Sequence, residues 1–228
     1  MLKRRSVILK PKFLIVKLTL LFMFLVVSVM PVTADAASKE KKSSHKQCLT
    51  PSVIELKDTF RKLWSDHVIW TKNYIVSAFA NSEDKEKVLA RLLQNQQEIG
   101  NVYKPYYGEA VGDKLAQLLR EHILIAGKVV AAVLSNNQTD LEKYNKEWYD
   151  NADDIAKFLS AQNPKYSYEQ LKEMFHEHLE LITDDVTARV KKDWDAEIVA
   201  FDKGLEHMIM FGDLLTEGIV KQFPDKFN

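Results

Sequence analysis

Apolar side chains recur at alternating steps of four and three residues through most of the chain beyond residue 50, and this spacing restricts the fold more than any other feature. The period matches one face of an α-helix, whereas a half-buried strand would alternate at every second residue. The spacing and the polar breaks predict six helices, at about 51–80, 83–104, 109–135, 139–162, 167–192 and 194–223. We therefore expect an all-α chain.

Helix lengths indicate how these segments pack. The first and sixth predicted helices have about 30 residues each, roughly 45 Å at 1.5 Å per residue, and the third and fifth are slightly shorter. We expect these four to form a four-helix-bundle core with up-down connectivity, and the second and fourth to pack alongside as two additional helices. The seven glycines form no phosphate-binding loop, so a nucleotide-binding α/β fold has little support.

Residues 1–36 are typical of an export signal. Basic residues precede an apolar run over residues 13–29, and the small-residue site Ala34-Asp35-Ala36 follows it. We expect cleavage after Ala36 and export to the extracellular space or the cell envelope. The alternative is an uncleaved anchor that associates with the membrane through residues 13–29. Residues 37–49 are then a flexible basic linker, and residues 50–228 a single helical-bundle domain.

Charge and cysteine content exclude some classes of protein. The lone cysteine, Cys48, excludes an internal disulfide framework and a thiolate metal cage. The whole chain is neutral, but residues 47–228 hold 22 Lys and Arg against 30 Asp and Glu, a net charge of −8. An acidic bundle is a poor binder of nucleic acid, so we expect no nucleic-acid partner.

Four histidines fall on the apolar faces of the longest predicted helices. His67, His122, His178 and His207 lie near the middle of the first, third, fifth and sixth helices, respectively. In an antiparallel bundle these positions come to about the same level, so the four imidazoles are expected to form a central layer. Imidazoles are ligands of zinc, copper and iron, and the layer is therefore a candidate transition-metal site.

Polar residues at the edges of the same apolar faces are candidate partners of this layer. They are expected to ligate the metal or to orient the imidazole rings. The candidates are Glu98, Asp154, Asp185, Asn95 and Asn151. The alternative is a metal-free layer in which Asn and Asp side chains satisfy buried histidines and hold the helices in register.

No catalytic residue stands out from the sequence. A metallo-oxidase or metallohydrolase would need an open coordination position and a route for substrate, and no motif indicates either. We therefore favour a metal-binding protein, or a non-catalytic interaction protein of the cell envelope, over an enzyme.

The sequence also contains an internal similarity. At a shift of 56 residues, the second and third predicted helices resemble the fourth and fifth: Asn95 aligns with Asn151, and His122 with His178. A shorter match at a shift of 140 aligns His67 with His207. These two matches pair the second and third helices with the fourth and fifth, and the first helix with the sixth. A simple tandem duplication would not produce this order.

With these landmarks the chain resembles a group of exported, all-helical bacterial proteins of unestablished activity. The resemblance covers nearly the whole region after residue 36. It is carried by Asp66-His67-Val68, Asn95 to Gly100, Pro105-Tyr106-Tyr107-Gly108, Glu121-His122-Ile123, Asn151 to Ala156, Glu177-His178-Leu179 and Gln222-Phe223-Pro224. Some members bear labels such as glycosyltransferase or acetylglutamate kinase. Those activities normally rest on α/β nucleotide-binding folds, which the present pattern does not support.

Overall fold

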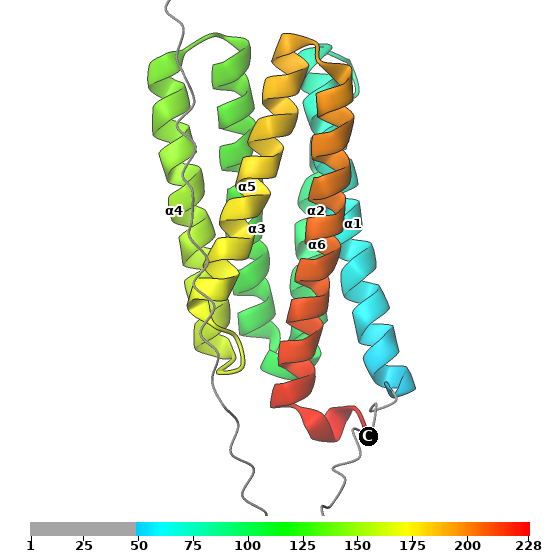
Figure 1. Ribbon diagram of the computed structural model, residues 1–228. Helices are drawn as coiled ribbons and strands as arrows, with labels where there is room; N and C mark the ends of the chain where they lie inside the picture. Colours follow the sequence, from blue (N-terminus) through cyan, green and yellow to red (C-terminus); the bar gives the residue numbers. More distant parts are fainter. Residues whose placement is uncertain (1–48) are drawn as a thin grey trace, which may run out of the picture. The chain divides into compact units, whose positions relative to one another are not determined.

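The computed structural model describes residues 49–228, and its regular structure in that range is entirely helical (Figure 1). The helices are α1 (Pro51–Phe79), α2 (Lys85–Tyr107), α3 (Glu109–Leu134), α4 (Gln138–Gln162), α5 (Tyr168–Lys191) and α6 (Trp194–Gln222), followed by the short 3-10 helix η1 (Pro224–Lys226). The predicted all-α bundle is confirmed. The predictions for residues 1–48, which comprise the export signal or anchor and most of the linker, lie outside the described residues.

Side-chain caps explain where several helices begin. Thr50 accepts a hydrogen bond from the backbone of Val53 at the start of α1. Asn137, Ser167 and Asp193 cap α4, α5 and α6 in the same way. Each cap satisfies a backbone N–H group that has no partner within its helix.

The second helix is longer than predicted. It continues through Pro105 to Tyr107, and the chain then turns at Gly108, whose φ of 85° suits a residue without a Cβ atom. The prediction ended the helix at residue 104 because a proline removes one helical hydrogen bond. Pro105 lies in the last turn, where that loss affects only the end of the helix.

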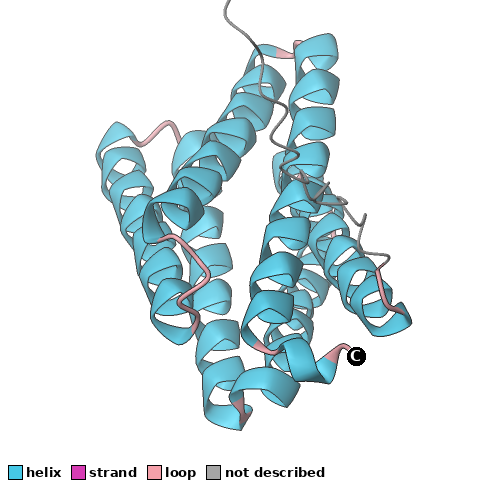
Figure 2. Cartoon of the chain, turned by 60° about the horizontal axis from the view of Figure 1, so that its bottom comes forward, coloured by secondary structure: helices cyan, strands magenta, loops and turns pink. Residues whose placement is uncertain are grey.

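The helices pack in an antiparallel, up-down arrangement with short connecting loops (Figure 2). Each helix packs against its neighbours in sequence, and α6 packs back against α1. Thus α2 lies against α1 and α3, and α4 lies against α3 and α5. No described helix is long and apolar enough to cross a membrane.

The six helices form three equivalent hairpins, α1–α2, α3–α4 and α5–α6. Residues 55 or 56 positions apart occupy the same place in successive hairpins and are buried alike. These sets include Phe60, Leu115 and Leu171; Trp64, Leu119 and Phe175; Val68, Ile123 and Leu179; and Ile99, Ile155 and Phe211. The repeating unit is therefore one helical hairpin, and a tandem order does explain the internal similarity. The match at a shift of 56 residues had paired equivalent helices, but it left out α1 and α6, and the match at a shift of 140 joins α1 to α6, which are not equivalent.

Candidate functional site

Three histidines occupy equivalent positions in the three hairpins. His67 on α1, His122 on α3 and His178 on α5 are each 3% exposed. Each lies one helical turn after a backbone carbonyl that accepts a hydrogen bond from the second helix of its hairpin. Asn95 donates to Leu63 (3.0 Å), Asn151 to Leu118 (3.3 Å) and His207 to Met174 (2.8 Å). The repeat therefore brings three of the four predicted histidines to one level.

His67 and His178 meet in the interior of the bundle. Their Nε2 atoms are 3.4 Å apart, and their ring centroids are 5.3 Å apart. The other ring nitrogen of His67, Nδ1, lies 3.3 Å from the Gln96 amide nitrogen, which also donates to Leu92 O and Asn95 Oδ1. Because a side-chain amide nitrogen only donates, Nδ1 of His67 is the acceptor in this arrangement and Nε2 carries the proton, so metal binding at Nε2 requires the other tautomer of this ring. Nδ1 of His178 has no hydrogen-bond partner among the described residues.

His122 is oriented by a side-chain amide. Its Nδ1 lies 2.7 Å from Asn151 Oδ1, and the amide nitrogen of Asn151 donates to the Leu118 carbonyl. Because an amide oxygen only accepts, Nδ1 of His122 carries the proton and Nε2 carries the lone pair. Nε2 has no hydrogen-bond partner among residues 49–228, and the Trp148 ring packs against this imidazole with 5.4 Å between centroids.

Burial keeps these imidazoles uncharged. Desolvation lowers the pKa of His67 to about 3, with a further lowering from His122. It lowers the pKa of His122 to about 4. The pKa of His178 also falls well below its ordinary value because of burial and then of the neighbouring histidines. The three rings are therefore neutral near pH 7, which is the form that binds a metal ion.

The fourth predicted histidine has a different position. His207 occupies the place of Asn95 and Asn151 in its hairpin, and its Nε2 donates to the Met174 carbonyl. Its Nδ1 lies 3.4 Å from a carboxylate oxygen of Glu177. Both ring nitrogens thus face protein partners, so the structure separates His207 from the other three.

The predicted carboxylate partners do not lie with the histidines. Glu98 pairs with Arg91 at 3.2 Å, because it falls at the outer edge of α2, and Asp154 is exposed. Asp185 is buried two turns beyond His178, where Lys72 binds it at 2.8 Å. Within residues 49–228, no three or more His, Cys, Asp or Glu side chains surround one position in a way that could hold a metal ion.

Gln96 and Trp148, which contact the histidines, were missed by sequence reasoning. The hairpin repeat makes Asn95 the equivalent of Asn151, so it gives no signal for the neighbouring Gln96. Trp148 has the helical spacing of any core aromatic residue.

Comparisons of the chain with protein-family models, with curated proteins and with solved structures found no match. The functional argument therefore rests on the residues of this centre.

Proposed function

We propose that this is an exported protein that binds one divalent transition metal ion at the centre formed by His67, His122 and His178. The observation that carries the proposal is the separation of 3.4 Å between Nε2 of His67 and Nε2 of His178. Two nitrogens bound to one tetrahedral metal at about 2.0–2.1 Å each lie roughly 3.3–3.4 Å apart. Hydrogen bonds donated by N–H are usually shorter, about 2.7–3.2 Å when the acceptor is oxygen.

His122 is the third ligand in this proposal. The bond from its Nδ1 to Asn151 leaves Nε2 as the nitrogen available to a metal. A metal-bound histidine commonly donates its other ring N–H to an oxygen atom, which fixes the orientation of the ring. Because no group of three ligands is already assembled, binding requires the His122 ring to move toward the other two.

The chemistry of the centre favours zinc or copper. The candidate ligands are neutral imidazoles, which suit zinc, copper and iron, while the predicted carboxylates bind other side chains. Oxygen-preferring cations such as magnesium and calcium have no carboxylate here to bind them. Metal affinity should therefore fall steeply once the imidazoles are protonated or replaced.

Isothermal titration with Zn²⁺ and Cu²⁺, combined with elemental analysis of protein purified without a histidine tag, tests the proposal. We expect one ion per chain and at least a hundredfold weaker binding in His67→Gln and His178→Gln, since Gln is a poor ligand for these metals. Asn151→Ala should weaken binding about 10- to 100-fold through the orientation of His122.

Two variants serve as controls. His207→Asn reproduces the residue found at this place in the other two hairpins and should retain binding. His176→Gln alters a surface histidine that pairs with Asp153 at 2.7 Å and should also retain it. Failure of the unmodified chain to bind either ion would overturn the proposal. So would binding that survives in His67→Gln and His178→Gln. The three histidines would then be a hydrogen-bonded packing layer.

A further inference from the structure

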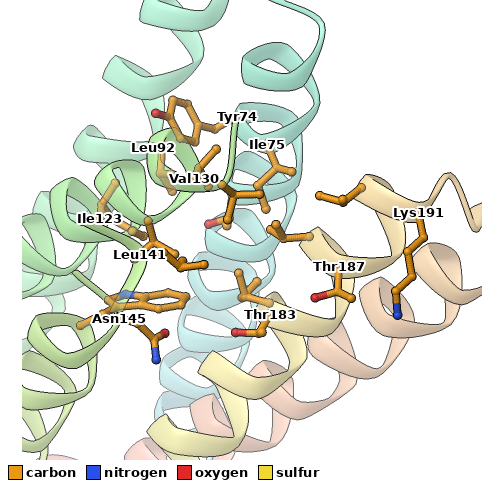
Figure 3. Close-up of a pocket in the computed structure, with 18 residues that line it drawn as sticks. Tyr74, Ile75, Leu92, Ile123, Val130, Leu141, Asn145, Thr183, Thr187 and Lys191 are labelled. Atoms are coloured by element: carbon orange, nitrogen blue, oxygen red, sulfur yellow. The ribbon is translucent and has the colours of Figure 1, made fainter. Parts of the chain in front are cut away.

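An apolar cavity of about 280 Å³ lies within the bundle, on the side where the α3–α4 loop is located. Side chains of α1 to α5 line it, and most are aliphatic. Figure 3 shows Ile75, Leu92 and Val130 on one side of this pocket, with Asn145 and Thr183 on the other. The volume is about twice that of an engineered cavity that binds benzene, which measures roughly 150 Å³.

The floor of the pocket is the layer of side chains directly above the three histidines. Thr71, Ala126 and Ile182 each follow one of these histidines by four residues, and all three line the pocket. Trp148 also lines the pocket and packs against the ring of His122. The pocket therefore ends about one helical turn from the candidate centre.

The pocket lies along the α4–α5 interface, which is the smallest interface between sequential helices. In Figure 1, α5 leans away from α4 at this end of the bundle. Lys72 of α1 bonds both to Asp185 of α5 and to Glu197 of α6, and Arg189 of α5 bonds to Glu197 at 2.9 Å. These ion pairs hold α5 against α1 and α6 on the side away from α4.

The exposed part of the lining is polar except for Val190. Thr183, Thr187 and Lys191 of α5 are exposed, and Asn145 of α4 is half-buried. Lys191 is the single charged residue among the described residues that line the pocket. A charged group is stable at this rim but not among the aliphatic side chains inside, where it would lack a partner.

We propose that the pocket binds a medium-chain aliphatic carboxylate, with its chain inside and its carboxylate beside Lys191. Since a cavity of roughly 150 Å³ holds the six carbons of benzene, one of about 280 Å³ holds roughly eleven atoms, which corresponds to a carboxylate of about ten carbons. The site does not depend on a bound metal, and the proposal extends beyond the proposed function.

Chain length gives the sharpest test. Each buried methylene should strengthen binding about fourfold, as expected from its transfer out of water. Affinity for linear carboxylates should therefore rise from hexanoate to decanoate and stop rising at dodecanoate, because longer chains extend into solvent. Adsorption to an exposed apolar surface would instead continue to strengthen with length. Isothermal titration in the presence of EDTA measures this series without any contribution from metal.

Two pairs of variants locate the ligand. Ala126→Phe places a ring in the pocket and should weaken decanoate binding at least tenfold, whereas Ala131→Phe, at an exposed position of the same helix, should not. Lys191→Gln should weaken decanoate binding by about two- to fivefold, the range of an exposed ion pair, and leave decanol binding unchanged. Lys192→Gln removes the same charge outside the pocket and should have no effect.

The proposal is overturned if decanoate shows no saturable binding, if affinity keeps rising beyond twelve carbons, or if Ala126→Phe binds as tightly as Ala131→Phe. An equal loss for decanol and decanoate in Lys191→Gln would contradict the assigned position of the carboxylate. Circular dichroism of each variant establishes whether the bundle is folded. Because all titrations contain EDTA, these outcomes are separate from those of the metal experiment.

Discussion

Lowering the pH from 7.5 to 5.0 is expected to destabilise the metal-free protein, because three buried imidazoles stay neutral in the folded state. Burial lowers the pKa of His67 to about 3 and of His122 to about 4, and it also lowers that of His178. In the unfolded chain each histidine titrates near 6.5. Between these values the unfolded state binds more protons, so stability falls as the pH drops below about 6.5.

The size of the effect follows from these pKa values. At pH 5.0 His67 and His122 each favour the unfolded state by about 2 kcal/mol, or about 4 kcal/mol together, and the lowered pKa of His178 adds to this loss. Near pH 5.5 these two histidines take up about 1.8 protons on unfolding, which gives a slope of roughly 2.4 kcal/mol per pH unit before the contribution of His178. The total is comparable with the whole stability of a typical domain, about 5–15 kcal/mol.

Urea unfolding followed by circular dichroism at 222 nm, in EDTA and at intervals between pH 7.5 and 5.0, measures this dependence. The range stops at pH 5.0 because carboxylates such as Asp213, whose pKa is lowered by its hydrogen bonds to Arg61, contribute at lower pH. His122→Gln should reduce the loss by about 2 kcal/mol. His176→Gln is the control, because the His176 side chain is only partly buried; this variant should lose as much stability as the unaltered protein. A loss smaller than about 2 kcal/mol in the unaltered protein would refute the reasoning.

Further predictions concern stability and use thermal and urea unfolding. Thr71→Val should stabilise the protein by about 1 kcal/mol, because the buried hydroxyl of Thr71 has no partner among the described residues. Gly204→Ala should stabilise α6 by about 0.5–1 kcal/mol, since an added Cβ meets nothing within 4 Å, whereas Gly218→Ala should destabilise it through a contact of 1.9 Å with a tyrosine ring. Lys72→Met should cost about 3 kcal/mol by leaving two buried carboxylates without this partner. Lys62→Met, at an exposed ion pair, should cost less than about 1 kcal/mol. Equal losses for the two lysines would contradict the role given to burial.

The helices were predictable because local signals agree with the packing. Thr50 and Pro51 mark the start of α1, and Gly108 marks the end of α2. The apolar spacing identified the buried faces, and with them the inward positions of His67 and His122. Such signals depend only on residues a few positions apart, so they can be recognised in the sequence without knowledge of the tertiary structure.

The composition of the centre was harder to predict because periodicity assigns a face and a level but no partner. Periodicity placed His207 with the other three histidines. In the structure, however, His207 donates a hydrogen bond to the backbone of α5, as Asn151 does to the backbone of α3. Periodicity also could not tell that Glu98 and Asp185 would bind Arg91 and Lys72. Which of two charged neighbours a carboxylate binds depends on the packing of adjacent helices.

The pocket was not predictable from the sequence. Its aliphatic lining repeats the pattern of an ordinary core, and the space arises from the way α5 leans away from α4 (Figure 1). The ion pairs formed by Lys72 join helices far apart in the sequence. The pattern of apolar residues along the chain does not indicate how far α5 lies from α4.

The packing of α6 against α1, which closes the ring of six helices, has a consequence for folding kinetics. Each interface between sequential helices forms within a short stretch of chain, but the α6–α1 interface joins residues as distant as Arg61 and Asp213, which are 152 positions apart. The folding rate should therefore be limited by this last association, whose entropic cost grows only slowly with chain length. A circular permutant that begins at α3 and ends at α2 would make the α6–α1 contact local and the α2–α3 contact distant. Since the three hairpins are equivalent, it should fold at a similar rate by stopped-flow measurement.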